Sequence, residues 1–318
     1  YQTELKNKII KSQLADKFFK VEGKPGTGKT LLCYDIAKDY INSGKKVIIF
    51  HSGLLNDGHE KLNAEKGWDI RPAKKASSLF AEANEPDLVI IDEAQRIYSQ
   101  QFKEIDEYIE SSNKTKLVIS YDPRQTLSKK EQDHSLVNLI YNEDKILEKY
   151  TSIVLSKKIR TNPSVANFIQ GLFNLPDMNN AHDFNKISVE YFTNFEDCKD
   201  YVQNIEHLNK DTTENWTTFN YTTSSINYEP LHEQYLSNKL TAHQIIGQEF
   251  ENVIAILDNN FTYNENNQLI YTSRTYYDPE KMLYQMVTRT VNKLKIIVVN
   301  NPHLYYRILE AINKSSVK

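Results

Sequence analysis

Short apolar runs alternate with polar stretches of helical periodicity along the first half of the chain. The apolar runs, each as long as one buried strand, are residues 18–21, 46–50, 88–91 and 117–120. Between two of them, apolar residues spaced by four (Leu32, Ile36 and Tyr40) predict an amphipathic helix over 29–42. Further helices are expected at 1–16, 57–65, 76–84 and 102–111. Strands that alternate with helices predict a parallel sheet.

The second half repeats this alternation. Its expected strands are residues 151–155, 187–192, 216–221, 252–257 and 294–299. One helix is expected to begin near Pro163 and another to cover 195–208, and the Asn-rich stretch 258–268 predicts a loop or hairpin. A chain of 318 residues suits about two domains. We therefore predict an α/β protein with mostly parallel sheets and no large accessory domain, divided into residues 1–150 and 151–318.

Composition narrows the class of protein. The chain is 39% hydrophobic and 25% charged, and no apolar run is long enough for a membrane helix. The two cysteines, Cys33 and Cys198, are too far apart for a disulfide framework or a zinc site, and the histidines show no metal-ligand spacing. We expect a cytoplasmic protein with no membrane segment and no structural metal. Because the chain begins at Tyr1 rather than Met, we also expect an excised piece or a missing start.

Residues 23–30, Gly-Lys-Pro-Gly-Thr-Gly-Lys-Thr, fit the phosphate-binding loop G-x-x-x-x-G-K-[ST] and stand between an expected strand and an expected helix. The glycines let backbone N–H groups point at phosphate oxygens, and the helix adds its positive dipole end. Lys29 then bridges the β- and γ-phosphates of a nucleotide, and the Thr30 hydroxyl ligates Mg²⁺. The other loop residues expected around the nucleotide are Gly23, Pro25, Gly26, Thr27 and Gly28.

A pair of acids, Asp92 and Glu93, ends the apolar run of residues 88–91. A carboxylate at the carboxyl end of a buried strand is placed to hold Mg²⁺, and its neighbour is placed to orient and deprotonate an attacking water. We assign the first role to Asp92 and the second to Glu93. Next to a phosphate loop, this pair favours ATP hydrolysis over nucleotide binding alone. The alternative is a charged strand end without function.

Other candidates follow the remaining strands. Gln125, shortly after the run 117–120, is placed to sense the γ-phosphate, and Gln2 either reads the adenine edge or is a solvated helix residue. A net charge of −3 requires that any contact with nucleic acid use a local groove. We expect a single strand of nucleic acid to be held there by His51, Ser52, Thr222, Thr223, Thr241 and His243. For each of these residues the alternative is a structural role.

These motifs belong to an ordered series that spans nearly the whole chain. After the phosphate loop and the acidic pair come Asp-Pro-Arg-Gln (122–125), Lys-Ile-Arg-Thr-Asn-Pro (158–163), His-Gln-Ile-Ile-Gly-Gln-Glu-Phe-Glu-Asn-Val (243–253) and Tyr-Gln-Met-Val-Thr-Arg-Thr (284–290). In this order the series resembles the core of superfamily-one helicases, which consists of two RecA-like domains. Within that group it looks most like the Schlafen-type DNA/RNA helicase domain family of bacterial proteins.

The resemblance implies roles for residues of the later motifs. In such helicases the glutamine of the third motif, here Gln125, contacts the γ-phosphate. The arginine of the fourth motif, here Arg160, and the arginine finger of the sixth, here Arg289, reach the phosphates from the second domain. The glycine and glutamate of the fifth motif, here Gly247 and Glu249, lie near the ribose and phosphates. Such cations neutralise the charge that develops in phosphoryl transfer.

The resemblance also implies an ATP- and Mg²⁺-dependent motor on single-stranded or duplex DNA or RNA, with ATP hydrolysed between the two domains. A fused or associated nuclease or other effector domain is a further expectation, because family relatives often carry one, including in defence against phage. The chain departs from the common pattern at Ile246, where a lysine is usual, and at Val291, where a second arginine-like residue is usual. A regulatory ATPase that senses nucleic acid or a partner without unwinding is the alternative. A small-molecule kinase fits less well, because the second half carries arginine motifs and no obvious acceptor-binding lid.

Overall fold

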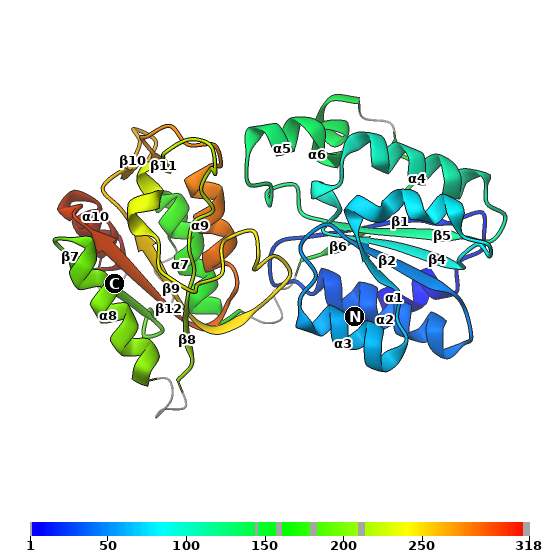
Figure 1. The fold of residues 1–318 in the computed structure, drawn as a ribbon, viewed down its shortest axis with the longest axis horizontal. Coiled ribbons are helices and arrows are strands. Elements are labelled where there is room, and N and C mark those ends of the chain that lie inside the picture. Colours follow the sequence, from blue (N-terminus) through cyan, green and yellow to red (C-terminus); the bar gives the residue numbers. More distant parts are fainter. Residues whose placement is uncertain (1, 144–145, 157–160, 179–182, 209–213, 314–318) are drawn as a thin grey trace. The chain divides into compact units, whose positions relative to one another are not determined.

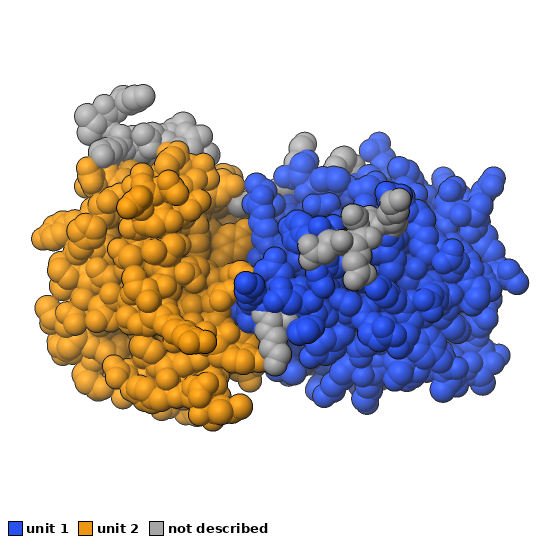
Figure 2. Space-filling view, turned by 90° about the horizontal axis from the view of Figure 1, so that it is seen from above, with its two compact units in different colours: residues 1–159 blue, residues 160–318 orange. Residues whose placement is uncertain are grey.

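The computed structural model describes residues 2–143, 146–156, 161–178, 183–208 and 214–313. The chain folds into two compact units, residues 1–159 and residues 160–318 (Figure 2). Each unit has its own parallel sheet and its own buried apolar clusters. Among the described residues, no helix is both long enough and apolar enough to cross a membrane.

The first unit is built on a six-stranded sheet in the order β3-β2-β4-β5-β1-β6 (Figure 1). Its strands are β1 (Phe18–Gly23), β2 (Val47–His51), β3 (Ile70–Pro72), β4 (Leu88–Asp92), β5 (Lys116–Tyr121) and β6 (Thr151–Leu155). All neighbouring strands run parallel, as predicted. Because their carboxyl ends therefore meet at one edge, the loops after β4, β5 and β1 lie side by side there.

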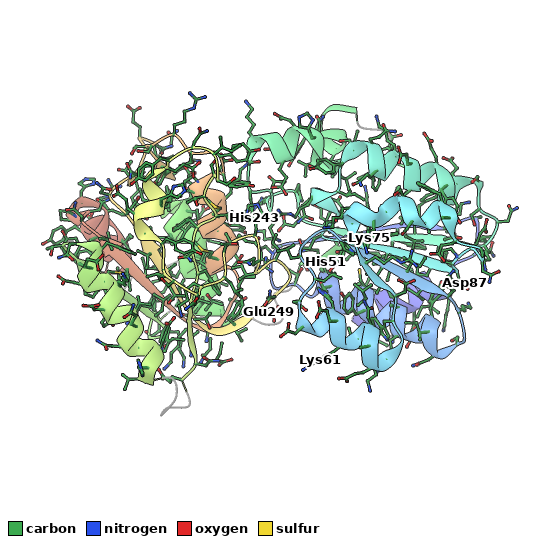
Figure 3. The ribbon with its side chains drawn as sticks, viewed as in Figure 1. His51, Lys61, Lys75, Asp87, His243 and Glu249 are labelled. Atoms are coloured by element: carbon green, nitrogen blue, oxygen red, sulfur yellow. The ribbon has the colours of Figure 1, made fainter. Side chains whose placement is uncertain are left out.

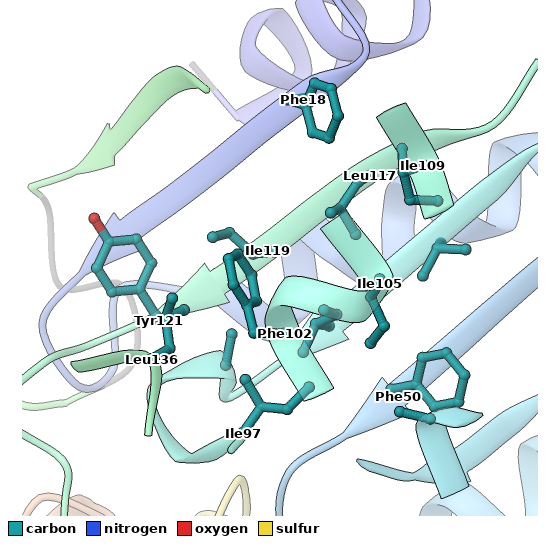
Figure 4. Close-up of a cluster of buried hydrophobic side chains, with 14 of the residues drawn as sticks. Phe18, Phe50, Ile97, Phe102, Ile105, Ile109, Leu117, Ile119, Tyr121 and Leu136 are labelled. Carbon is teal, nitrogen blue, oxygen red and sulfur yellow. The ribbon is translucent and has the colours of Figure 1, made fainter. Parts of the chain in front are cut away.

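Helices cover both faces of this sheet. They are α1 (Gln2–Ile10), α2 (Lys29–Asn42), α3 (Asp57–Lys66), α4 (Ser99–Ser111), α5 (Lys129–His134) and α6 (Leu136–Asn138), with the 3₁₀ segments η1 (Ala73–Ala81) and η2 (Ala94–Arg96) and the π-helical segment η3 (Leu139–Glu143). Successive residues of β4 enter two different cores. Ile91 belongs to the cluster that includes Phe102 of α4 (Figure 4), and Ile90 to the cluster that includes Leu32 of α2. A sheet covered on both faces requires such continuous apolar runs.

The second unit holds a four-stranded parallel sheet in the order β7-β12-β9-β8. Its strands are β7 (Ile187–Phe192), β8 (Trp216–Thr218), β9 (Phe250–Leu257) and β12 (Thr290–Val299), next to the hairpin of β10 (Phe261–Tyr263) and β11 (Leu269–Tyr271). Its helices are α7 (Pro163–Phe173), α8 (Phe195–Leu208), α9 (Pro279–Val287) and α10 (Pro302–Asn313), with η4 (Leu175–Asp177) and η5 (Pro230–Gln234). The Asn162 side chain caps α7 by accepting the Ser164 N–H at 2.9 Å.

Three expectations about the elements and the units need correction. The strand 151–155 does not open the second half, because β6 pairs with β1, and the units divide after residue 159 rather than after residue 150. The helix expected at 76–84 is instead the 3₁₀ segment η1. Its buried residues Ala73, Ala76 and Leu79 recur every three positions, which matches the three-residue turn of a 3₁₀ helix.

We predict that Phe102→Ala destabilises the first unit by about 3–5 kcal/mol, because removing a fully buried ring leaves a cavity. Phe80→Ala, whose ring is 44% exposed, is the control and should cost clearly less. Each unit contains one tryptophan, Trp68 or Trp216. Urea unfolding followed by Trp68 fluorescence in a Trp216→Phe background therefore reports the first unit, and equal loss in both variants would contradict the assigned core.

Candidate functional site

The phosphate-loop motif forms the turn between β1 and α2. Gly26 and Gly28 have φ angles of 74° and 88°, a left-handed conformation that glycine adopts without strain. A Cβ atom at Gly23 would stand 2.4 Å from the Thr27 Oγ1 atom, so this position also requires glycine. Beyond the turn, the 14-residue helix α2 adds the positive end of its dipole. The loop therefore has the form of a phosphate cradle.

Lys29, the first residue of α2, has a nearly buried side chain. Its Nζ atom donates to the Gly23 carbonyl oxygen at 2.6 Å and to the Lys24 carbonyl oxygen at 3.4 Å. Both acceptors are neutral groups of the loop itself. A phosphate oxygen is a stronger acceptor for an ammonium group than a carbonyl, so Lys29 is positioned to exchange these contacts for a bound phosphate.

Asp92 ends β4 as a fully buried carboxylate. The Thr30 hydroxyl donates to its Oδ1 and Oδ2 atoms at 3.2 and 3.1 Å, and the Ser120 hydroxyl of β5 donates to Oδ1. Burial, the largest single influence, raises the pKa of Asp92, but His51 and the two hydroxyls together outweigh burial and lower this pKa below its usual value. Asp92 is therefore ionised at neutral pH and lies against the hydroxyl with which it is expected to hold Mg²⁺.

Glu93 has a left-handed backbone conformation, with φ 55° and ψ 40°, and a nearly buried side chain. For a residue other than glycine this conformation costs about 1–2 kcal/mol, and such strain concentrates at functional sites. Gln95 Nε2 donates to Glu93 Oε2 at 2.6 Å, and Gln95 Oε1 accepts the Asp122 N–H at 3.2 Å. Gln95 thus fixes the carboxylate of Glu93. No role was predicted for Gln95, although its place two residues after Glu93 in the motif was a signal.

Gln125 lies in the loop after β5, with a buried side chain whose Nε2 donates to Asp122 Oδ2 at 2.9 Å. Asp122 therefore contacts both Gln95 and Gln125 and joins the end of β4 to this loop. The predicted residues that the structure brings to this one edge of the sheet are Lys29, Thr30, Asp92, Glu93 and Gln125.

The structure corrects the expectation that His51 contacts nucleic acid. β2 extends one residue further than expected, so His51 (labelled in Figure 3) is its last residue and pairs in register with Asp92. Its exposed fraction is 0%. Its Nδ1 atom lies 3.4 Å from Asp92 Oδ2, and its ring centroid lies 4.6 Å from that of His59. A fully buried ring has no surface for a strand. For Ser52, whose N–H donates to the Asp92 carbonyl oxygen at 3.0 Å, the contact stays a prediction.

In the second unit, adjacent segments carry the other residues predicted to hold nucleic acid. Asn220 and Thr241 form an isolated parallel bridge, and His243 Nδ1 lies 2.8 Å from the Thr222 hydroxyl oxygen. Thr223, next to Thr222, is half-buried. These contacts bring Thr222, Thr241 and His243 together (Figure 3 labels His243).

For the remaining predicted residues the structure gives fewer contacts. Gly247 has a φ of 77°, which again suits glycine, and Glu249 immediately precedes β9. Arg289 Nε donates to a carbonyl oxygen of α9 at 3.3 Å. Arg160 lies outside the described residues, and Gln2 begins α1 with a side chain that is also outside them.

A protein-family model, the Schlafen group 3 DNA/RNA helicase domain, matches residues 16–215, which is well over half of the chain. The chain belongs to this family. It is therefore a helicase-like protein with a phosphate-binding loop, as its motif series predicted. The loop and Asp92, Glu93 and Gln125 lie inside the matched segment, whereas Arg289 lies beyond it.

Two solved structures are among those similar to this Schlafen group 3 domain. The Pif1 helicase from Candida albicans is 13% identical with a TM-score of 0.49, and the match covers 98% of both chains. The C-terminal domain of a possible DNA helicase from Lactobacillus plantarum WCFS1 is 14% identical with a TM-score of 0.30, and that match covers 49% of this chain and 97% of the other. None of the curated proteins matches the chain.

Buried His59 makes the first unit sensitive to acid. Its Nδ1 atom accepts the Asn56 N–H at the start of α3 at 3.1 Å. Burial above all, and His51 beside it, lower the pKa of His59 from 6.5 to about 4. Between these two values the unfolded chain binds a proton that the folded chain does not. The stability that neutral His59 contributes is therefore complete above the unfolded pKa and is lost as the pH falls toward the folded one.

We predict that the free energy of unfolding of the first unit falls by about 2 kcal/mol between about pH 7 and about pH 5. His59→Asn is the matched control, because it keeps an acceptor for the Asn56 N–H but does not titrate. Urea unfolding of both proteins at each pH, followed by Trp68 fluorescence in the Trp216→Phe background, measures the effect. The same pH dependence in the variant would exclude His59 as its source.

Proposed function

We propose that the chain is an ATP-dependent, superfamily-one helicase-like motor that acts on DNA or RNA. The observation that carries the proposal is the contact between Thr30 of the phosphate loop and the ionised Asp92, with Glu93 next to it. Membership of a DNA/RNA helicase domain family supports nucleic acid as the partner. We further propose that both units are RecA-like domains, since each has a parallel sheet with helices packed against it.

ATP is proposed to bind with its phosphates on the loop and on Lys29. The hydroxyl of Thr30 and the carboxylate of Asp92 fit Mg²⁺, which prefers oxygen ligands and is commonly held by one or two carboxylates together with substrate phosphates. When bound, Mg²⁺ neutralises phosphate charge. Among the described residues, no group of three or more His, Cys, Asp or Glu is placed to hold a metal ion.

Glu93 is proposed to take the proton of the water that attacks the γ-phosphate. The hydrogen bond from Gln95 at 2.6 Å supports this role, because it orients the carboxylate before the substrate arrives. Gln125 is proposed to contact the γ-phosphate from the next loop. Asp122 is hydrogen-bonded both to Gln95, which orients Glu93, and to Gln125. The residue proposed to activate water and the residue proposed to contact the γ-phosphate are therefore linked through Asp122.

The second unit is proposed to supply Arg160 and Arg289 to the phosphates, and Gly247 and Glu249 near the ribose. Their charge neutralises the phosphoryl group in the transition state. These residues belong to the second unit, and we propose that they act when the two units close on ATP. Closure and reopening then move the motor along a strand. The residues proposed to hold that strand are Ser52, Thr222, Thr223, Thr241 and His243.

We predict that single-stranded DNA or RNA raises steady-state ATP hydrolysis at least about tenfold, which corresponds to about 1.4 kcal/mol of barrier. Glu93→Gln should lower the stimulated rate by about 10²–10⁴-fold and keep nucleotide binding, because it removes only the base. Glu104→Gln is the matched control. Like Glu93, Glu104 accepts a hydrogen bond from a glutamine side chain, here Gln100 on the same helix at 2.9 Å, but it has no proposed role in catalysis.

Two results would contradict this prediction. Hydrolysis that is indifferent to both nucleic acids would exclude the autonomous motor and support a regulatory ATPase. Full ATP hydrolysis by Glu93→Gln would exclude Glu93 as the base that activates water. A strand-displacement assay then separates unwinding from hydrolysis in the wild-type chain.

We predict that Arg289→Ala lowers ATP hydrolysis by about 10³-fold or more with little change in ATP affinity, because an arginine finger acts on the transition state. Arg274→Ala, at an exposed arginine of the same unit, is the control. Hydrolysis rates and binding of a fluorescent ATP analogue measure the two effects separately. An equal loss of affinity and rate would assign Arg289 to ground-state binding instead.

A further inference from the structure

His51 is a fully buried imidazole whose two ring nitrogens both lack a hydrogen-bond partner. Leaving one buried polar atom unpaired costs about 1–3 kcal/mol, so such a group in a native core requires an explanation. Core packing alone does not supply one, because an apolar side chain would fill the same place without this penalty. The surroundings of the ring indicate a role that needs a nitrogen.

One of the two nitrogens faces the proposed Mg²⁺ ligand. His51 and Asp92 are register partners on the adjacent strands β2 and β4, and Nδ1 lies 3.4 Å from Asp92 Oδ2. This is ion-pair distance, although the hydrogen-bond geometry is not met. Ser120 donates to the other oxygen, Oδ1, and Thr30 donates to both. Groups from β2, β5 and α2 thus surround the carboxylate, and only the one from β2 is not yet hydrogen-bonded.

His59 lies next to the ring of His51. The two ring centroids are 4.6 Å apart with planes tilted by 45°. The Nδ1 atom of His59 is already engaged by the Asn56 N–H, which fixes this ring at the start of α3. The His51 ring therefore has the His59 ring and the Asp92 carboxylate as neighbours. Alignment of Nδ1–H with Oδ2 would give the Asp92 carboxylate a further donor besides the hydroxyls of Thr30 and Ser120.

We propose that His51 is a positioning residue for Mg²⁺ binding, whose Nδ1–H fixes the Asp92 carboxylate in the orientation that the ion requires. The proposal rests on the proposed function, since it assumes that Asp92 holds Mg²⁺. A carboxylate that ligates a metal through one oxygen needs donors that fix its plane, and loss of such a donor typically costs about 10–100-fold in metal affinity. His51 does not touch the nucleotide in this proposal and acts only through Asp92.

Three substitutions at His51 separate positioning from packing. His51→Asn places an amide N–H near the position of Nδ1 and should keep the contact with Asp92. His51→Gln places its amide near the position of Nε2, away from the carboxylate, and His51→Leu has a similar size to Asn but no donor. His59→Asn is the matched control, because it changes the adjacent buried ring, keeps the Asn56 cap and does not touch Asp92.

The readout is binding of fluorescent ADP by the whole chain, measured with EDTA and across a Mg²⁺ titration. We expect His51→Leu and His51→Gln to raise the Mg²⁺ concentration at half-maximal effect by about 10–100-fold. Binding in EDTA should stay at the wild-type value, because Lys29 and the loop are unchanged. His51→Asn and His59→Asn should both follow the wild type. Thermal unfolding of each variant in EDTA identifies any general loss of folding.

Each contrary result overturns the inference in a recognisable way. If His51→Leu and His51→Gln keep the wild-type Mg²⁺ dependence, or if His59→Asn shifts it as much, the ring is a packing residue. If His51→Leu does not fold, the comparison of Asn with Gln decides, and equal Mg²⁺ dependence for these two excludes positioning by Nδ1. If the wild-type chain binds ADP equally with and without Mg²⁺, the proposed function fails as well.

Discussion

The buried charge of Asp92 is the constraint on which the rest of the site depends. A carboxylate without exposed surface is costly unless neighbouring groups stabilise its charge. Here Thr30, Ser120 and His51 do so from three different elements. Their positions follow from strand register, because a shift of one residue would turn each strand side chain to the opposite face of the sheet. The pairing of β2 with β4 and of β4 with β5 is therefore a condition for the charge as well as for the core.

A line of hydrogen bonds extends the same edge beyond Asp92. It runs from Glu93 to Gln95, then to Asp122 and Gln125, and so connects the end of β4 with the loop after β5. All four residues are nearly buried. Loss of the Gln95 side chain would remove the hydrogen-bond partner that it supplies to the Glu93 carboxylate and to the Asp122 N–H. The left-handed backbone at Glu93 is held within this network, which explains how a strained residue persists there.

Features decided by neighbours in sequence could be predicted, and features decided by distant partners could not. The phosphate loop and the buried strands are local patterns, and they were predicted close to where the structure has them. β6 resembles any short strand in sequence, and only the pairing of Ile153 with Val21 assigns it to the first sheet. In the sequence, His51 has the position of the first residue of a loop. Its place at the end of β2 depends on pairing with Asp92 of β4, which is distant in sequence. The contacts of Gln95 likewise depend on the loop after β5.

The second unit has the same alternation of strands and helices, but two of its helices begin with acids, unlike α2 of the first unit. In the first unit, α2 follows β1 directly and carries no acid in its first turn. In the second unit, α8 follows β7 and begins with Glu196 and Asp197, and α9 carries Glu280 in its first turn. Acids at a helix N-terminus already complement the dipole and would repel a phosphate. The dipoles of α8 and α9 are thus already complemented by acids, whereas α7 and α10 carry no acid in their first turns. Unlike α2, neither of these two follows a loop with the phosphate-binding motif, so in the proposed cycle the second unit contributes positive charge through side chains such as Arg289.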